Sequence, residues 1–191
     1  MNRPVLQVIV ASTRPGRVGP AFARWFTARA EADGWFDVEV VDLAELALPF
    51  LDEPEHPRLG RYRHEHTRRW SATVDRADAF VVCTPEYNHG YPAPLKNALD
   101  FLHAEWADKP VGFLSYGGVS AGTRSVQQLK QVVAALRMVP AVEAVTVPSA
   151  GSVVGPDGEV RATGAMDSAA DAMLTELARL TARLRPVPAA S

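Results

Sequence analysis

The feature that most limits the possible folds is a repeated alternation of short apolar runs with longer amphipathic segments. The run from Ala79 to Thr84 shows the first half of this pattern, because it is apolar almost throughout and lacks a polar residue at every second position. Such continuous runs are typical of strands in a parallel sheet, whose two faces are both covered by helices. The alternation therefore predicts an α/β fold in which crossover helices connect parallel strands.

Five strands are expected, at Val5 to Ala11, Phe36 to Asp42, Ala79 to Thr84, Val111 to Tyr116 and Val142 to Val147. Helices are expected at Pro20 to Asp33, Glu65 to Ala77, Pro94 to Glu105, Thr123 to Met138 and Ser168 to Leu184. Because crossovers between parallel strands are right-handed, few topologies are available to such a chain. We predict an open five-stranded parallel sheet of order 2-1-3-4-5.

Length and composition indicate one domain. The chain has 191 residues, of which 47% are hydrophobic, and this is enough for one large core. We expect a single domain over residues 1–185 and a disordered tail over 186–191. Two segments break the alternation, Leu48 to His64 and Pro148 to Ala165, and the first is long enough to be a lid or an interface arm.

Charge and cysteine content exclude several classes of protein. The net charge of −2 argues against nucleic acid as a partner. No segment approaches the roughly 20 apolar residues of a membrane span, so no membrane partner is expected. Cys83 is the single cysteine, which excludes internal disulfides and predicts a reducing, cytoplasmic location. Its place in an apolar run favours a small core residue over a catalytic thiol.

The loop after the first strand gathers groups that bind phosphate. Ser12 to Gly19 contains two hydroxyls, two guanidinium groups and two glycines, and Pro20 follows at the start of a helix. A helix N-terminus with nearby donors suits a phosphate dianion. The loop is neither a Walker A motif nor a Gly-x-Gly-x-x-Gly motif. ATP and an NAD bound in the usual dinucleotide-binding loop are therefore disfavoured as its ligands. The alternative is a polar surface turn with two solvated arginines.

The loop after the third strand is polar, aromatic and stiff. Glu86, Tyr87, Asn88 and His89 follow the strand directly, and such side chains hydrogen-bond to and stack on flat ligands. Prolines further along the loop keep it from becoming strand or helix too early. A third loop, Ser115 to Gly122, follows the fourth strand, and its paired glycines let backbone N–H groups approach a ring edge.

These loops are predicted to meet. With strand order 2-1-3-4-5 the chain reverses direction between strands 1 and 3, and ligands bind beyond the carboxyl ends of the strands at that point. The first two loops follow those two strands, and the third loop follows the neighbouring strand. We therefore predict one site for a ligand with a phosphate and a flat ring.

Three motifs together resemble the NAD(P)H-dependent FMN reductase family, whose relatives include quinone, chromate and azo-dye reductases. They are the run PEYNHGYPAPLKNALDF, which ends at Phe101, the Ser-Thr-Arg-Pro-Gly-Arg loop and the Ser-Tyr-Gly-Gly turn. The resemblance spans about Val5 to Val147. It implies a flavodoxin-like three-layer sandwich, non-covalently bound FMN and NADPH or NADH as co-substrate. It also implies a small-molecule electron acceptor and a homo-oligomer, either homodimer or homotetramer.

The resemblance also assigns residues. It places Ser12, Thr13, Arg14, Arg17 and Gly19 at the FMN phosphate, Pro85, Glu86, Tyr87 and Asn88 against the isoalloxazine, and Ser115, Gly117 and Gly118 near its pyrimidine side. The chain departs from the commoner pattern at Ala11, where glycine is frequent, and at Phe101, where tryptophan is frequent. Gly19-Pro20 replaces a serine often found at the helix start.

The predicted chemistry belongs to the cofactor, so no catalytic side chain is expected. Glu86 is interpreted as an acceptor that organises its loop, with a catalytic acid as the alternative. His89 is either a group that touches flavin or substrate or a simple polar loop residue. His64 and His66 form a His-x-His pair, for which a solvated loop is favoured over a metal site.

The resulting prediction is an FMN-dependent NAD(P)H oxidoreductase with a ping-pong cycle. One alternative is a flavodoxin-like electron carrier without a nicotinamide site, which would dock to protein partners. Another is a flavin-free regulatory domain on the same fold.

A subunit interface is expected beside the third-strand loop. Phe101, Leu102 and Trp106 follow one another closely, and a single short helix that also turns Leu95 and Leu99 inward cannot direct all of them to one core. Part of this apolar surface is therefore expected to be buried by a partner subunit.

Overall fold

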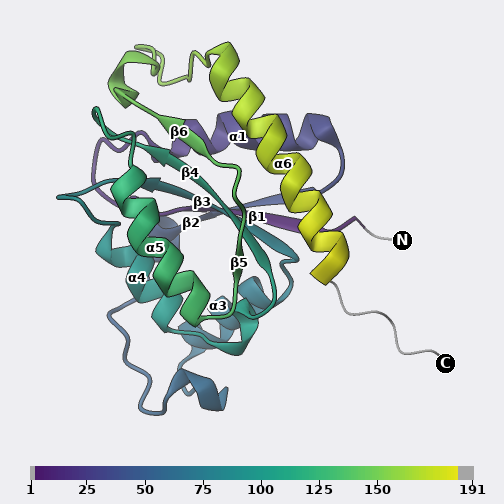
Figure 1. Cartoon of the computed structure of the whole chain (residues 1–191). Coiled ribbons are helices and arrows are strands. Elements are labelled where there is room, and N and C mark those ends of the chain that lie inside the picture. The colour runs from purple at the N-terminus through teal and green to yellow at the C-terminus, as the bar shows by residue number, and fades with distance from the viewer. Residues whose placement is uncertain (1–2, 185–191) are drawn as a thin grey trace.

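The structure is a computed structural model that describes residues 3–184. Its strands are β1 (Val5–Val10), β2 (Asp37–Asp42), β3 (Ala79–Pro85), β4 (Pro110–Tyr116), β5 (Val139–Pro140) and β6 (Val145–Val147) (Figure 1). Its helices are α1 (Gly19–Asp33), α2 (Leu43–Leu46), α3 (Glu65–Asp75), α4 (Ala93–Asp100), α5 (Thr123–Ala135) and α6 (Gly164–Leu184). Short 3₁₀ turns lie at Pro57–Leu59, Ala104–Trp106 and Ala150–Ser152. The predicted tail lies outside the described residues.

The sheet has the predicted order. Its strands run β2-β1-β3-β4-β5 and all pairs are parallel. The fifth strand differs from the prediction, because it is divided into β5 and β6, which both pair with β4. Between them the chain leaves the sheet, and Val142, predicted to begin the strand, is 81% exposed.

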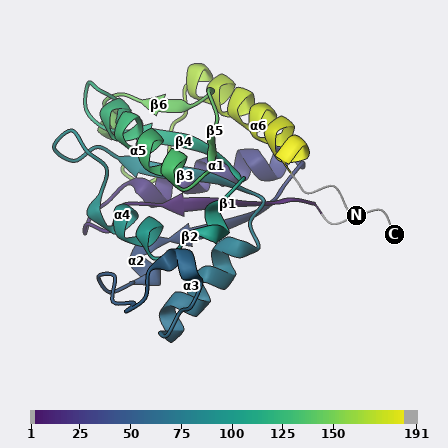
Figure 2. The same ribbon diagram turned by 60° about the horizontal axis from the view of Figure 1, so that its bottom comes forward.

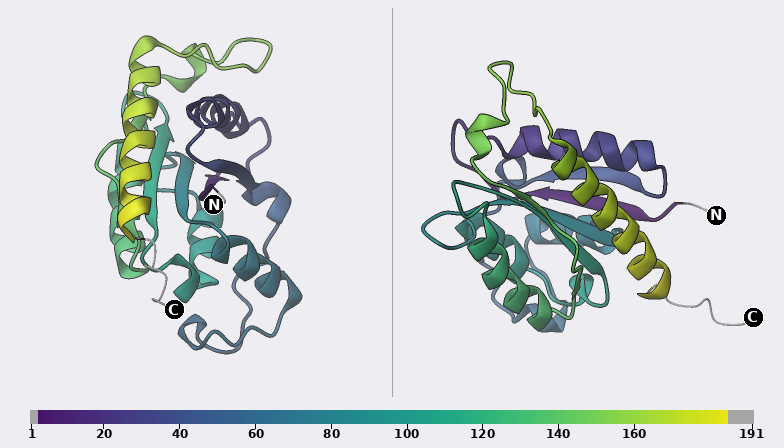
Figure 3. Two further views of the ribbon diagram at one scale, coloured as in Figure 1. Left: turned by 90° about the vertical axis from the view of Figure 1, so that its right-hand side faces the viewer. Right: turned by 45° about the horizontal axis from the view of Figure 1, so that its top comes forward.

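Two helical layers cover the sheet. Helices α1 and α6 lie on one face, and α3, α4 and α5 lie on the other (Figures 1 and 3). The first face buries Phe22 and Phe26 of α1 against Met173 of α6. The second face buries an aromatic cluster around Trp70 of α3. The predicted three-layer sandwich is confirmed.

Helix α4 ends earlier than predicted, and its early end directs the apolar residues that follow it into the core. The helix stops at Asp100, and the chain turns before the short 3₁₀ turn Ala104–Trp106. Trp106 thereby returns to the core, with its ring centroid 5.7 Å from that of Trp70 and 5.0 Å from that of Phe80. Phe101, Leu102 and Trp106 are all buried within the chain itself. The expectation that a partner buries part of this cluster was therefore wrong.

Other helix boundaries differ by a few residues. Helix α5 stops at Ala135, short of the predicted Met138, and Arg137 has a positive φ of 63°, which a continuing helix does not allow. Helix α3 stops at Asp75, and α6 begins at Gly164, four residues before the predicted Ser168. The start of α1 is displaced by one residue, and Gly34 closes it with a left-handed cap as expected. Within residues 3–184 no helix is both long and apolar enough to cross a membrane.

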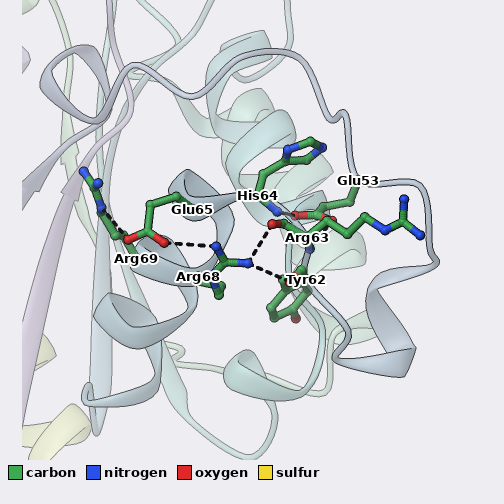
Figure 4. A network of polar contacts seen from close by, with 7 residues as sticks. All are labelled: Glu53, Tyr62, Arg63, His64, Glu65, Arg68 and Arg69. Atoms are coloured by element: carbon green, nitrogen blue, oxygen red, sulfur yellow. Dashed lines mark hydrogen bonds and ion pairs between the residues drawn. The ribbon is translucent and has the colours of Figure 1, made fainter.

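The long segment from Leu48 to His64 is anchored to the rest of the chain. Within the segment, the Glu53 carboxylate accepts the backbone N–H groups of Arg63 at 2.8 Å and His64 at 2.9 Å, which closes the segment on itself (Figure 4). In the same view the Arg68 guanidinium donates to the carbonyls of Tyr62 and Arg63. The Tyr62 hydroxyl in turn donates to the buried carboxylate of Glu105 at 2.8 Å. Side-chain bonds thus fix a segment that has little regular structure.

Candidate functional site

The candidate site lies at the carboxyl edge of the sheet, where the loops after β1, β3 and β4 emerge. The β3 and β4 loops project from the same end of the molecule (Figure 2). Side chains tie the three loops together. The Tyr116 hydroxyl donates to Ser12 Oγ at 3.2 Å and so joins the β4 loop to the β1 loop. Arg124 donates to Glu86 and joins the start of α5 to the β3 loop.

The β1 loop presents an uncapped helix start and an exposed cation. The N-cap residue of α1, Val18, has no side-chain cap hydrogen bond, so the positive end of the helix is not compensated locally. The Arg14 side chain is exposed and has no salt-bridge partner within residues 3–184. Thr13 beside it is half-buried. This part of the loop has the donors that a phosphate requires.

Arg17 has a partner that the sequence analysis did not anticipate. Its Nη1 and Nη2 atoms donate to the two carboxylate oxygens of Asp42 at 2.6 and 2.7 Å, and Nη1 also donates to the Ser12 carbonyl at 2.7 Å. The hydrogen bond to Asp42 raises the pKa of Arg17. The two side chains are only 18% and 12% exposed. Arg17 is therefore neither solvated nor free, unlike Arg14.

Ser12 and Gly19 form the buried floor of the loop. The Ser12 side chain is fully buried, and burial raises the pKa of Tyr116, so its phenol stays protonated and able to donate to Ser12. A Cβ on Gly19 would lie 2.5 Å from Ser12 Oγ and 2.7 Å from the Tyr116 hydroxyl oxygen. Ser12 lies in the loop after β1 and Gly19 at the start of α1, and their contact with a phosphate stays a prediction. They pack beneath the loop surface, however, and a ligand there would meet Arg14 and Thr13 first.

The β3 loop is a tight hairpin. Tyr87 and Gly90 exchange backbone hydrogen bonds of 2.9 and 3.0 Å, and Asn88 and His89 between them both have positive φ. Two consecutive positive φ values are typical of a type I′ turn, which asparagine tolerates well. The amide of Gln128 donates to the His89 carbonyl at 3.1 Å. The turn holds the Tyr87 side chain outward, and the residue is 38% exposed.

Glu86 organises this hairpin. Its carboxylate accepts Arg124 Nε at 2.5 Å and the Arg124 backbone N–H at 3.2 Å, and its side chain is only 6% exposed. Burial acts to raise the pKa of Glu86, but hydrogen bonds from Arg124 and Ser120 outweigh it and lower the pKa overall. An ionised carboxylate is a poor proton donor. The interpretation of Glu86 as an organising acceptor is confirmed, and Pro85 is buried at the end of β3 beneath it.

The β4 loop is a glycine turn. Gly118 accepts the N–H groups of Ala121 and Ser149 through its carbonyl, and an added Cβ at Gly118 would meet no atom within 4 Å. Gly117 donates its own N–H to Val147. The Ser115 hydroxyl was expected near a ligand, but it is buried and donates to the Ala121 carbonyl at 2.8 Å. It therefore shapes the turn and is not presented by it.

Three side chains that bind predicted site residues were given no role in the sequence analysis. They are Asp42, Arg124 and Tyr116, although Tyr116 is part of the Ser-Tyr-Gly-Gly turn. Asp42 ends the second strand, so its position at the carboxyl edge could have been found from the strand order. Tyr116 similarly ends the fourth strand. Arg124 gives no such signal, because only the tertiary structure brings it to Glu86.

The other residues considered in the sequence form no second site within residues 3–184. Cys83 is fully buried, and burial raises the pKa of its thiol, in agreement with a core residue. His66 Nε2 lies 2.9 Å from Asp52, and the His64 and His66 rings stack with centroids 5.2 Å apart. Among the described residues no three metal-binding side chains gather in one place.

Comparison with known proteins gives matches that agree with one another, because the family model and the relatives below are all FMN-linked reductases. The family model of NADPH-dependent FMN reductase matches residues 5–152. The chain is 43% identical over 149 residues to an NAD(P)H-dependent FMN reductase of Schizosaccharomyces pombe, covering 76% of this chain and 74% of the relative. It is 30% identical over 130 residues to an FMN-dependent NADPH-azoreductase of Staphylococcus saprophyticus, covering 68% and 69% of the two chains.

A solved structure supports the fold. The flavoenzyme FerB of Paracoccus denitrificans, an NAD(P)H:(acceptor) oxidoreductase, superposes with a TM-score of 0.73 and covers 92% of this chain and 98% of its own. The sequence identity is 22%, so this likeness concerns the fold alone.

We predict that Gly19→Ala destabilises the chain. The new methyl group cannot coexist with the Ser12 and Tyr116 hydroxyls at the observed spacing, so the start of α1 must shift. We expect the free energy of unfolding to fall by about 1–3 kcal/mol, as for other overpacked sites. Chemical denaturation measures it. Gly118→Ala is the control, because that position has open space. An equal effect of the two substitutions would contradict the tight packing at Gly19.

Proposed function

Because this chain belongs to the NADPH-dependent FMN reductase family, we propose that it reduces a small-molecule acceptor by a ping-pong cycle at one cofactor site. The chain is an oxidoreductase that uses FMN as cofactor and NAD(P)H as co-substrate. Bound FMN would supply two-electron chemistry, namely uptake of a hydride from NAD(P)H with a proton from solvent and return of two electrons, with the accompanying protons, to the acceptor. The two substrates would then use the same site in turn.

The observation that supports this proposal most is the joining of three loops at one edge of the sheet. Arg14 and the uncapped start of α1 lie on the β1 loop, and the β3 hairpin and the glycine turn lie on the neighbouring loops. This donor set fits FMN, which carries a phosphate at one end and a flat ring at the other. The open space at Gly118 leaves room for a ring edge to approach the backbone.

We assign distinct roles to the residues of this site. Thr13 and Arg14, with the backbone before Gly19, would hold the phosphate. Tyr87 and Asn88 would lie against the isoalloxazine, and Gly117 and Gly118 would border its pyrimidine side. Ser12, Pro85, Glu86 and Ser115 would support these groups from below, since three of them are buried and the Glu86 side chain is held by Arg124. No side chain needs to act as an acid or base.

The proposed acceptors are free flavin, quinones, azo dyes and chromate. The name of the Staphylococcus relative supports azo compounds. We predict that the purified protein oxidises NAD(P)H in the presence of at least one member of this panel. Initial rates measured over both substrate concentrations should give parallel double-reciprocal lines. Intersecting lines would contradict the ping-pong cycle. A yellow protein that oxidises neither NADH nor NADPH with any acceptor would favour the electron carrier.

A second prediction concerns the phosphate. Arg14→Gln should weaken FMN binding by about tenfold, because one charge-assisted hydrogen bond of at least about 1.4 kcal/mol is lost. Riboflavin lacks the phosphate, so its affinity should not change. Quenching of flavin fluorescence measures both. Arg179→Gln on the exposed surface of α6 is the matched control for the loss of charge. If riboflavin binding falls as much as FMN binding, Arg14 does not contact the phosphate.

We also propose that two copies of the chain associate through an apolar groove of about 460 Å³. The groove lies between α2, α4 and the start of the Leu48 to His64 segment, where Asn97 of α4 donates to the Pro49 carbonyl at 2.7 Å. Phe50 lines it and is 86% exposed. One surface thus offers both a projecting ring and an apolar recess, and a two-fold contact requires such self-complementarity.

The cytoplasmic location of the protein remains a prediction.

Substitution of Phe50 tests this interface. Light scattering of the wild-type chain should report at least a dimer at micromolar concentration. Phe50→Asp places a charge in the apolar contact and should shift the protein towards monomer. Val142→Asp introduces the same charge at a residue that is 81% exposed and lies away from the groove, and it should leave the mass unchanged. A monomeric wild-type protein, or a Phe50→Asp variant that stays dimeric, would refute the proposed contact.

A further inference from the structure

The two arginines of the β1 loop look equivalent in the sequence but not in the structure. Arg14 is exposed without a salt-bridge partner among the described residues, whereas Arg17 donates hydrogen bonds to both carboxylate oxygens of Asp42. Three of the hydrogen bonds that the Arg17 guanidinium can donate go to Asp42 and the Ser12 carbonyl. The two-point contact is the strong geometry of this side chain.

The negative charge of Asp42 is unfavourable next to an anion-binding site. It ends β2, which lies next to β1, so its carboxylate stands at the same edge of the sheet as the loop. One of its oxygens also accepts the N–H group of Ala44 at 3.0 Å and caps α2, which keeps the carboxylate in place. With only 12% exposure, water screens this charge little. An unpaired Asp42 would repel a phosphate dianion.

The charges of Arg17 and Asp42 cancel. As a pair they provide no net attraction for a phosphate, so the net positive charge of the loop side chains comes from Arg14. We propose that Arg17 is a positioning residue of the cofactor site, which neutralises Asp42 and holds the Ser12 carbonyl in place, while Arg14 supplies the charge that attracts the phosphate. This inference rests on the proposed FMN site.

Removal of both charges distinguishes this role from direct contact. Arg17→Gln leaves Asp42 unpaired and should weaken FMN binding by at least about tenfold, with an effect on riboflavin below about threefold. Adding Asp42→Asn to this variant removes the repulsion and should recover most of the lost FMN affinity. A direct phosphate ligand would not be replaced in this way, and the double variant would bind FMN as weakly as Arg17→Gln.

A matched control separates local charge from net charge. Asp37 begins the same strand and lies at its opposite end, about 17 Å from Asp42 at the rise of an extended strand. Arg17→Gln with Asp37→Asn has the same net charge as the test variant but should recover no FMN affinity. Equal recovery with Asp37→Asn would overturn the local role of Asp42.

Folding is monitored independently by chemical denaturation of the cofactor-free variants. If Arg17→Gln does not fold, Arg17→Lys serves instead, because lysine keeps the charge beside Asp42 and loses the two-point contact. Neutralisation predicts that Arg17→Lys weakens FMN binding by less than about threefold. A loss of tenfold or more, about 1.4 kcal/mol, would overturn the proposal.

The outcomes also separate this proposal from the function on which it rests. A wild-type protein that does not bind FMN refutes both. Tight wild-type binding without recovery in the double variant, or with Arg17→Gln binding as well as wild type, refutes the role of Arg17 alone.

Discussion

Parallel pairing of β1, β3 and β4 is the constraint on which the rest of the structure depends. The register sets Val10 opposite Cys83 and Pro85 opposite Tyr116, so these strands end close together at one edge. Every connection must then cross back over the sheet, which places helices on both faces and leaves the loops together at the carboxyl ends. The site is thus a consequence of the topology, and two of its loops follow strands, β3 and β4, that are buried at every residue.

The loops themselves are held by a second level of interactions. Each has one polar side chain directed inward, namely Ser12, Glu86 and Ser115, and each of these binds a group from another loop or from its own far end. Further along each loop other residues are exposed, namely Arg14, Tyr87 and Gly118. This division explains why a family motif contains more residues than any ligand could touch, because part of the motif maintains the shape of the site.

Local sequence patterns correctly predicted the features that depend on neighbouring residues, namely the type of sheet and the end of a helix. The continuous apolar run of β3 indicated a parallel sheet, and Gly34 marked the end of α1. The failures involve distant partners. The position of Trp106 depends on contacts with Trp70 and Phe80, which no local pattern contains. The Arg17 and Asp42 pair joins residues that are 25 positions apart. The fifth strand is divided because its two parts, β5 and β6, pair with different residues of β4. Only the three-dimensional arrangement reveals these features.

The anchoring of the Leu48 to His64 segment has a consequence for association. Arg68 and Glu105 bind this segment to the rest of the chain, and Glu53 closes the segment on itself, without a partner present. Phe50 projects from its first part, next to the bond between Asn97 and Pro49. A contact made by this surface would therefore lose little backbone entropy, because the ordering that usually opposes binding is already complete in the isolated chain.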